Sequence, residues 1–431
     1  MSTLNKIRII LILSVISISS AYTQSNSTTS PYSRYGYGVL SDKGVGLSRG
    51  MGGISYGLRG LNANPGNPAS YSGVDSLTFI FDLGISYSNA RLSDSGGSQN
   101  DNNGGLDYLT ILFPISKRLG VSAGFLPYSS VGYSFGSVQE IDGAAYQKYF
   151  SGSGGLSQVY GGIAYEPFNG ISIGANVSYL YGTITHNRNI PVISENAYTR
   201  SEYRKLRVNA AKFDFGLQYQ FPAFKGKTLT LGAVYSPKIS PNARIKGIDM
   251  MASGDTISIL PSTKADAELP QSFGFGFTLK TNKLLFGADV TFQNWKKLNY
   301  SDRMADSMTV DNRFNDRWRF NAGVEYVINP NSRNFFHRMK FRGGVNYSNS
   351  YINVHNSQNN NTDGYNEYGA TVGFGLPFRD TYTNRTSYVN ISFEYTNLSP
   401  KYKNGMIKEQ YFGVSIGVNI NDLWFMKNKF K

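Results

Sequence analysis

Side chains that could perform catalysis or hold a metal are sparse in this chain of 431 residues. It contains no cysteine, and its three histidines, His186, His337 and His355, fall in or beside expected connections between strands. The lack of cysteine excludes disulfides, thiolate metal sites and a lipid-anchoring cysteine. No serine, histidine and aspartate set is recognisable by spacing. We therefore expect no enzyme activity, no cofactor and no metal site.

Two glycine-rich stretches near the N-terminus invite other interpretations. Residues 44–53 (GVGLSRGMGG) are superficially similar to a phosphate loop, but the spacing is wrong and no strand–loop–helix unit surrounds them. Residues 64–73 (NPGNPASYSG) hold two prolines and two glycines, which excludes a regular helix or strand. This second stretch is either a compact plug whose prolines fix the path of the chain or a tight turn that leads into the first strand.

Alternation of apolar and polar residues decides the fold class. Between residues 284 and 293, one face carries Leu284, Phe286, Ala288, Val290 and Phe292, and the other carries Gly287, Asp289, Thr291 and Gln293. The same period of two recurs over residues 389–396 and 412–421. Such segments are strands with one apolar and one polar face.

On this basis we predict fourteen strands, and an even number is what a bacterial outer-membrane barrel requires. The expected connections alternate between long ones, such as 91–105, 136–155, 183–207 and 242–270, and mostly shorter ones, such as 117–118 and 167–170. Long outer loops and short periplasmic turns are typical of that class. The prediction is an all-β, fourteen-stranded antiparallel transmembrane β-barrel. The strands begin near Leu77, Leu106, Leu119, Leu156, Ile171, Val208, Thr228, Gln271, Leu284, Asp311, Lys340, Tyr365, Ser387 and Glu409.

Export to the outer membrane of a Gram-negative bacterium is indicated by the first residues. Lys6 and Arg8 precede an apolar run over residues 9–18, followed by small residues. This run is shorter than the roughly 18 residues of a spanning helix and has the charge order of a secretory signal. We expect residues 1–22 to be a cleaved signal peptide.

The polar strand face carries charges of both signs, which in a barrel would point into the lumen. They would pair across the lumen or with a plug, because an unpaired charge away from water is costly; a selectivity filter is the alternative. These residues are Lys212, Asp214, Asp289, Arg317, Arg319, Glu325, Lys340, Arg342 and Glu394.

Several stretches, taken in order, resemble the FadL-type outer-membrane transporters. Asn67, Pro68 and Ala69 match the motif that ends the N-terminal hatch of that family. Residues 119–136 (LGVSAGFLPYSSVGYSFG) resemble its third strand, interrupted here at Pro127, and residues 268–298 resemble a later pair of strands ending at Trp295. The resemblance implies an N-terminal arm and hatch over residues 23–75 and a barrel over residues 76–431.

The function that this resemblance implies is passive uptake of hydrophobic small molecules, such as fatty acid-like compounds. The hatch would shift, and the ligand would leave sideways through a gap at the kinked third strand. Asn67, Pro68 and Ala69 would belong to this gate together with Pro127 and Gly124. Proline cannot donate to a strand ladder, and glycine eases bending. The alternative for Pro127 is a place beyond the membrane rim, where the strand ends.

A second function remains open: a barrel that does not transport but acts as a partner subunit of a secretion or barrel-assembly complex. The long connections 183–207 and 242–270 would suit docking, as would the arm from Ser30 to Leu40. We expect outer-membrane lipid and either a hydrophobic ligand or other outer-membrane proteins as partners. Nucleic acid is excluded, because the net charge of +14 is not gathered into a dense basic cluster in the sequence.

Overall fold

The computed structural model describes residues 27–423, except for residues 42–43, 61, 142–143, 191–199, 225, 252–253, 301–313, 357–360, 381–384 and 403–404. The expected signal peptide therefore lies outside the described residues. No helix in the described part of the chain is both long and apolar enough to cross a membrane.

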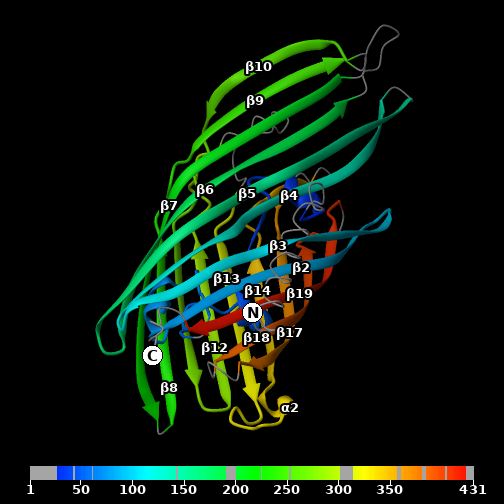
Figure 1. Cartoon of the computed structure of the whole chain (residues 1–431). Helices are drawn as coiled ribbons and strands as arrows, with labels where there is room; N and C mark the ends of the chain where they lie inside the picture. Colours follow the sequence, from blue (N-terminus) through cyan, green and yellow to red (C-terminus); the bar gives the residue numbers. More distant parts are fainter. Residues whose placement is uncertain are drawn as a thin grey trace, which may run out of the picture.

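Within the described residues, fourteen antiparallel strands form a closed ring (Figure 1). The ring closes where β19 pairs with β2, from Lys408 opposite Ser93 to Leu423 opposite Thr78. The predicted fourteen-stranded barrel is therefore confirmed. In order around the ring the strands are β2 (Thr78–Asp94), β3 (Gly97–Ser116), β4 (Leu119–Ile141), β5 (Ala144–Phe168), β6 (Ile171–Ile190), β7 (Arg200–Phe224), β8 (Lys227–Ser236), β11 (Ser272–Lys280), β12 (Leu284–Gln293), β13 (Arg317–Val327), β14 (Lys340–Asn349), β17 (Tyr365–Arg379), β18 (Thr386–Pro400) and β19 (Lys408–Leu423).

The remaining elements lie inside the ring or extend it. The N-terminal region holds three 3-10 helices, η1 (Pro31–Arg34), η2 (Gly46–Met51) and η3 (Pro68–Gly73), and the short strand β1 (Val39–Leu40). A hairpin of β9 (Asn242–Met251) and β10 (Thr256–Ala265) is inserted between β8 and β11, and β9 pairs with the outer half of β7. Small elements, β15 (Val354–Asn356), β16 (Asn361–Asp363) and α2 (Phe335–Arg338), complete the fold.

The outer face of the ring is apolar, as the alternation requires. Along β7 every second side chain from Phe213 to Tyr219 is 40–47% exposed, and the residues between them are buried or half-buried against the lumen. Apolar side chains of this kind facing outward are suited to contact with lipid. The opposite face supplies the polar wall of the lumen.

Several connections that the sequence indicates as long loops are strands in the structure. β4 and β5 stay paired as far as Ile141 opposite Ala144, and β6 pairs with β7 to Ile190 opposite Arg200. Residues 242–270 contain the whole β9–β10 hairpin. Beyond the hydrocarbon, neither face must be apolar, so the alternation weakens while the backbone pairing continues. The result is a sheet of β4–β7, β9 and β10 that projects beyond the rest of the ring (Figure 1).

β3 and β4 are paired over only part of their length. They pair from Ser116 opposite Leu119 up to Leu109 opposite Phe125, and no pairing follows. Above that point β3 continues with β2, and β4 continues with β5 (Figure 1). We call this V-shaped separation the β3–β4 seam.

Candidate functional site: the hatch, the arm and the β3–β4 seam

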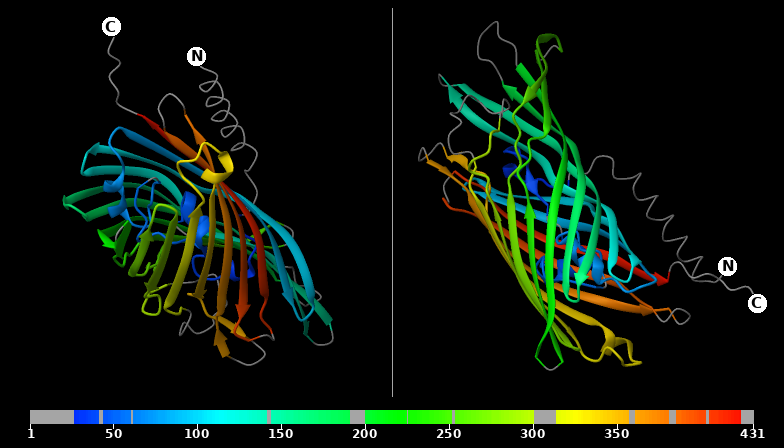
Figure 2. Two further views of the ribbon diagram at one scale, coloured as in Figure 1. Left: turned by 90° about the horizontal axis from the view of Figure 1, so that it is seen from below. Right: turned by 90° about the vertical axis from the view of Figure 1, so that its left-hand side faces the viewer.

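The N-terminal segment over residues 28–73 lies inside the barrel. Viewed along the ring, the helices of this segment lie within it (Figure 2). Met51, Ile54 and Tyr71 are fully buried, which is possible only because strands surround them on all sides. We call residues 44–73 the hatch and residues 28–41 the arm.

The NPGNPA stretch forms a compact structural unit within the hatch. Asn67 caps η3, since its side-chain oxygen accepts a hydrogen bond from the N–H of Ala69 at 3.1 Å. Its amide nitrogen donates to the carbonyl of Tyr56 at 2.8 Å. Pro68 occupies the first helical position, where its missing N–H leaves no intrahelical bond unmade. All three residues of the predicted motif are buried.

Inward-pointing polar side chains from around the ring hold the hatch backbone. Asp289 on β12 accepts hydrogen bonds from the N–H groups of Ser55 and Tyr56, the latter at 3.0 Å. Gln218 on β7 donates to the carbonyls of Tyr56 and Leu58, both at 2.9 Å. Asp289 thus satisfies two consecutive backbone N–H groups with one side chain, so it is a principal anchor.

The hatch also approaches the wall so closely that only glycine fits there. A Cβ on Gly344 of β14 would stand 2.1 Å from the nitrogen of Gly52, and one on Gly174 of β6 would stand 2.5 Å from the carbonyl carbon of Pro68. Backbone therefore rests directly on backbone at both ends of the hatch. Glycine on the polar strand face is what permits this contact.

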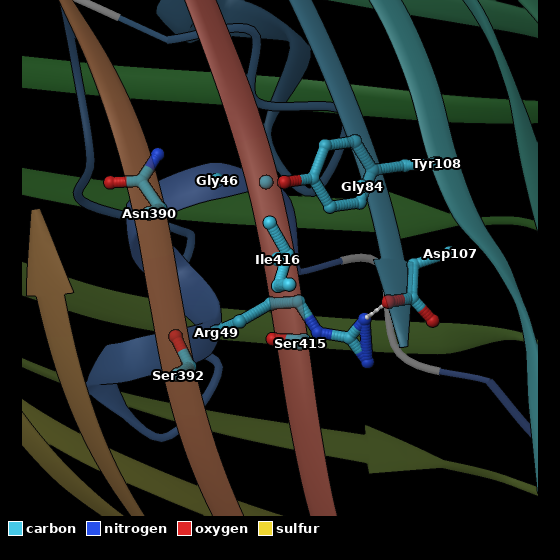
Figure 3. Close-up of a pocket in the computed structure, with 10 residues that line it drawn as sticks. Gly46, Arg49, Gly84, Asp107, Tyr108, Asn390, Ser392, Ser415 and Ile416 are labelled. Atoms are coloured by element: carbon cyan, nitrogen blue, oxygen red, sulfur yellow. Dashed lines mark ion pairs between the residues drawn. The ribbon is translucent and has the colours of Figure 1, made fainter. Parts of the chain in front are cut away.

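Arg49 of η2 lies at the junction of hatch and wall. Its guanidinium forms ion pairs with Asp107 on β3 and with Glu394 on β18, the latter at 3.3 Å. Arg49 and Asp107 line a small pocket, whose empty volume is about 170 Å³ with open solvent included (Figure 3). Ligand pockets for small molecules span roughly 300–1,000 Å³ and have mostly apolar walls. This pocket is smaller, and its lining includes Arg49, Asp107, Asn390, Ser392 and Ser415.

All nine charged residues predicted for the lumen are buried or half-buried and lie on the inward face of their strands. Most of those on β13 and β14 form one network, in which Glu325 accepts from Arg342 at 2.8 Å and from Lys340 at 2.9 Å. Arg317 reaches Glu367 at 3.9 Å, and Arg319 donates to Asn321 at 3.0 Å. Lys212 pairs with Asp214 on β7 itself. Asp289 and Glu394 instead contact the hatch. These charged side chains thus stabilise the barrel wall and hold the hatch in place.

Pro127 and Gly124 lie at the point where the seam opens. Gly124 stands opposite Thr110 in one of the last paired rungs, and Pro127 follows directly before a bulge in the pairing of β4 with β5. The third strand of the barrel is therefore kinked where its proline stands.

The arm fills the seam above this kink. Val39 and Leu40 of β1 pair with Ser130 and Ser129 of β4, so β1 takes the place that β3 has left. Further along β4 from the kink, the Ser33 hydroxyl bonds to both the carbonyl and the N–H of Gly132. From the other side, the amide of Asn103 on β3 donates to the Thr29 hydroxyl at 3.3 Å. The arm thus contacts both edges of the seam.

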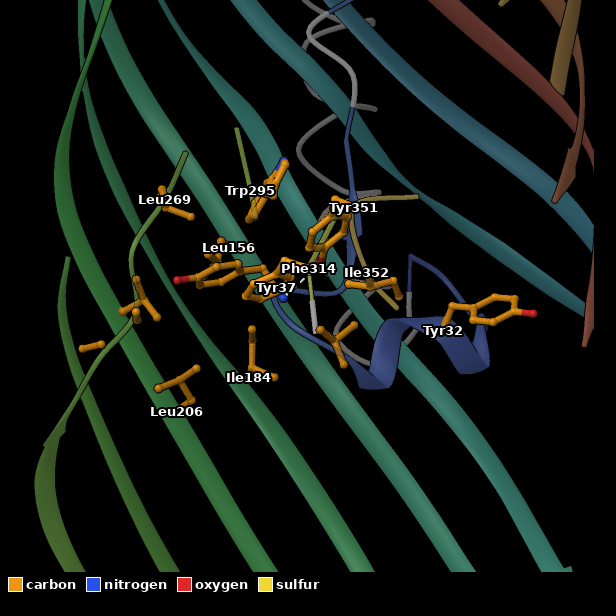
Figure 4. Close-up of a cluster of buried hydrophobic side chains, with 14 of the residues drawn as sticks. Tyr32, Tyr37, Leu156, Ile184, Leu206, Leu269, Trp295, Phe314, Tyr351 and Ile352 are labelled. Atoms are coloured by element: carbon orange, nitrogen blue, oxygen red, sulfur yellow. Dashed lines mark hydrogen bonds between the residues drawn. The ribbon is translucent and has the colours of Figure 1, made fainter. Parts of the chain in front are cut away.

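Aromatic packing anchors the arm inside the outer end of the barrel (Figure 4). Tyr37 is fully buried, and its ring lies 6.1 Å from that of Trp295. Its N–H donates to the Tyr351 hydroxyl at 3.1 Å, and that hydroxyl donates to the carbonyl of Gly38 at 2.6 Å. Burial raises the pKa of Tyr37 well above its ordinary value, so the phenol stays neutral. The arm is therefore part of the core and not a free docking strand.

The model of one protein family, BamG, matches residues 5–431, nearly the whole chain. The chain belongs to the BamG family. Members are components of the barrel-assembly complex with a FadL-like fold, and they are not enzymes. No curated protein sequence matches the chain.

Solved structures show the same fold at low sequence identity. The Pseudomonas putida toluene transporter TodX is 14% identical with a TM-score of 0.60, covering 89% of this chain and all of TodX (100%). A Pseudomonas aeruginosa FadL homologue is 14% identical with a TM-score of 0.59, covering 91% of this chain and 100% of its own. The CymD monoaromatic hydrocarbon channel is 15% identical with a TM-score of 0.57, covering 88% and 98%. The resemblance to FadL-type barrels is confirmed for the fold.

The expectation of a channel for hydrophobic small molecules is wrong. It rested on the FadL-type fold, which this BamG-family chain shares without the transport role. The arm in the seam and the polar hatch contacts give a physical reason, because the place of the expected sideways exit is occupied by the chain itself.

Sequence reasoning missed two residues that hold the plug. Asp82 on β2 accepts from the N–H of Ala63 at 3.2 Å and from Asn419 at 2.7 Å, and Arg49 supplies the ion pairs described above. A signal was present for both. Asp82 interrupts the apolar run TFIFDLG, and Arg49 is the one cation within GVGLSRGMGG. A lone charge in such surroundings indicates a buried partner.

Proposed function

We propose that this chain is a structural subunit of an outer-membrane barrel-assembly complex, with its own lumen held closed. Membership of the BamG family over residues 5–431 is the observation that carries this proposal. We include in it residues 1–22 as the export signal, residues 23–75 as arm and hatch, and residues 76–431 as the barrel. In this role Asn67, Pro68 and Ala69 fix the plug, and Pro127 and Gly124 shape the seam that receives the arm.

The manner in which the hatch is held supports a static plug. Asp82, Gln218 and Asp289 lie on well-separated strands, and each bonds to hatch backbone. A plug that moved would have to break these hydrogen bonds, made from well-separated strands, all together, at about 0.5–1.5 kcal/mol each. No energy source for such a movement is built into a passive barrel. A closed barrel is instead a rigid body against which another protein can be held.

The free edge of β3 suits contact with a partner. Gly97 to Tyr108 pair with β2 on one side, and within the described residues no strand pairs with the other side. The outer part, from Gly97 to Asn100, is exposed and lies beyond the contact of Asn103 with the arm. Exposed edges accept an added strand through backbone hydrogen bonds. The occupant that fits is an edge strand of a second outer-membrane subunit.

Gentle extraction tests the proposal. A tagged full-length chain, extracted in mild detergent, is expected to co-purify with other outer-membrane proteins of the assembly complex. A photo-cross-linking residue at Gln99 or Asn100 is expected to capture one of them. The matched control is the same residue at Tyr368 on β17, which is 48% exposed on the lipid-facing side. Recovery of the chain alone by several gentle methods would contradict the subunit role. Co-purification without cross-links from Gln99 or Asn100 would contradict only the docking edge.

A further inference from the structure

Five basic side chains gather on the outward face of the projecting sheet. They come from three strands that the register places side by side. Arg207 of β7 stands opposite Arg244 of β9, and Arg244 stands opposite Lys264 of β10. In the next row Lys205 of β7 stands opposite Lys246 of β9. Four of the five are exposed and Lys205 is half-buried. We call them the basic surface.

The basic surface is unfavourable for the sheet by itself. Directly opposed residues on neighbouring strands have Cβ atoms about 4.5–5.5 Å apart, and like charges in such pairs destabilise the sheet. None of the five forms an ion pair with any residue that the structure describes. Asp266, an exposed carboxylate just beyond the end of β10, follows Lys264 by two residues. An anion from outside the chain would therefore relieve the repulsion between these basic side chains.

The inward face of the same strands is organised in the opposite way. There Asp249 of β9 pairs with both Arg204 and Arg200 of β7, the latter at 2.6 Å. Glu202 pairs with Arg188 of β6 at 2.8 Å. Charges on the inward face are matched by partners within the sheet, whereas the five of the basic surface are of one sign. The inward charges therefore form an ion-pair network that stabilises the sheet. The outward charges instead form a surface suited to an anionic ligand.

The height of the basic surface above the membrane follows from β7. Its outward face is aromatic or apolar from Tyr219 to Phe213. Tyr179 of β6 stands opposite Ala211, and its ring stacks on that of Tyr181, with the ring centroids 5.7 Å apart. From Tyr219 to Asn209 the strand rises by ten residues, or about 33 Å along its axis and roughly 25 Å across a tilted barrel wall. That is the height of the apolar band of such barrels. Arg207 comes two residues later, roughly 5 Å above the band.

A layer of lipid headgroups extends several ångströms beyond the hydrocarbon on each side of a bilayer. Tyrosine rings mark its lower boundary. The basic surface stands directly above Tyr179 and Tyr181 on the same outward face, which is where outer-leaflet headgroups meet the barrel. An arginine or lysine there can neutralise phosphate groups, with arginine able to form two parallel hydrogen bonds to one phosphate.

We propose that the basic surface binds the phosphate groups of an anionic glycolipid in the outer leaflet. The glycolipid would remove the repulsion between Arg207, Arg244 and Lys264 and tie the projecting sheet to the membrane surface. This inference is independent of the partner-subunit role, because it concerns the wall on the far side of β7 from the seam.

The test replaces the charges of one row and compares two lipids. The variant Arg207→Gln, Arg244→Gln, Lys264→Gln and the wild-type full-length chain are reconstituted in nanodiscs with lipid A carrying its phosphates or with dephosphorylated lipid A. Bound lipid is measured by native mass spectrometry. Each basic residue near a charged membrane surface contributes about a fivefold change, so the loss of three is expected to weaken retention of phosphorylated lipid A roughly a hundredfold. Dephosphorylated lipid A is expected to be retained by neither protein.

The matched control is Lys227→Gln, Lys280→Gln, Lys283→Gln, which removes the same charge from three exposed lysines at the other end of the barrel. It is expected to retain phosphorylated lipid A as the wild type does. Equal loss in both variants, or equal binding of dephosphorylated lipid A, would overturn the proposal. So would an acidic protein whose binding depends on the same three residues while lipid retention does not. Unfolding of the first variant is not expected, because its substitutions remove repulsion, and unchanged heat-dependent gel mobility checks this.

Discussion

The hydroxyl of Ser33 donates a hydrogen bond to the carbonyl of Gly132 and accepts one from the N–H of the same residue, each at 3.0 Å. One side chain of the arm thus satisfies both backbone groups that β3 has left without a partner. Ser33 is fully buried and Gly132 is buried as well, so water cannot readily take its place. The arm closes the seam by imitating a neighbouring strand.

Replacing Ser33 by alanine tests this closure. Ser33→Ala orphans a buried N–H and a buried carbonyl, each at about 1–3 kcal/mol. We expect the amide of Gly132 to exchange with solvent roughly tenfold to a hundredfold faster, measured by hydrogen exchange and mass spectrometry. Ser27→Ala serves as control, because Ser27 makes only an exposed hydroxyl contact with Ser130 at 2.8 Å. Unchanged protection of Gly132 would show that the arm does not hold the seam.

Removing the carboxylate of Asp289 is expected to loosen the hatch without preventing barrel assembly. Asp289→Leu leaves the N–H groups of Ser55 and Tyr56 without their acceptor, at roughly 1–3 kcal/mol for each orphaned group. Limited proteolysis in moderate urea should then cleave the hatch at lower urea than in the wild type. Asp75→Leu is the control. The Asp75 side chain is 74% exposed, and its ion pair with Arg385 is long, at 4.0 Å. Failure to insert with an intact hatch would contradict this role.

Strand order could be predicted from the sequence because the bilayer imposes a simple rule. Where one face meets hydrocarbon, apolar residues must recur at every second position, and Asp289 or Arg342 between them must then face the lumen. This rule applies only to the parts of the strands that cross the hydrocarbon. Residues 97–103 of β3, read as a loop, are glycine and polar residues on both faces, yet they pair with β2 throughout. Pairing there is decided by the neighbouring strand and not by residue type.

Features built by distant parts of the chain left little trace in the sequence. Arg207, Arg244 and Lys264 are separated by at least twenty residues along the chain, so no basic cluster is visible until the strands are placed in register. The arm gave a partial signal in its three tyrosines, Tyr32, Tyr35 and Tyr37, around Arg34. Their partners, Trp295 and Tyr351, come from the far end of the chain. The composition could indicate a buried aromatic segment but not that it would close the seam.

A single methyl group on Gly344 should disturb the contact between hatch and wall. The Cβ in Gly344→Ala would stand 2.1 Å from the backbone nitrogen of Gly52, and backbone cannot rotate away as a side chain can. Overpacking of this kind is destabilising by about 1–3 kcal/mol or more. We expect a lower melting temperature in detergent and a hatch more open to protease. Gly343→Ala is the neighbouring control, because its nearest contact would be an ordinary 4.0 Å. Equal melting temperatures for the two variants would contradict the close approach.

Acid should weaken the projecting hairpin before it affects the barrel. Burial raises the pKa of Asp249, but hydrogen bonds from Arg204, Ser258 and Arg200 outweigh it and bring the pKa to about 2. The unfolded value is about 3.9, so the folded state favours the carboxylate. Its contribution to stability is therefore complete above about pH 4 and is lost as the pH falls towards 2. Pepsin, which is active in this range, should cleave β9 and β10 increasingly between pH 4 and pH 2.

The variant Asp249→Asn separates this effect from general acid damage. Asparagine can accept hydrogen bonds from Arg204 and Arg200 but carries no titrating charge, so the hairpin should be weaker at every pH and lose its pH dependence in that window. Gel mobility, measured over the same pH range, shows whether the barrel itself stays folded. If wild type and variant show the same dependence of pepsin cleavage on pH, another acidic group holds the hairpin. If the ring opens at the same pH as the hairpin, the projecting sheet is not an independently stable part of the fold.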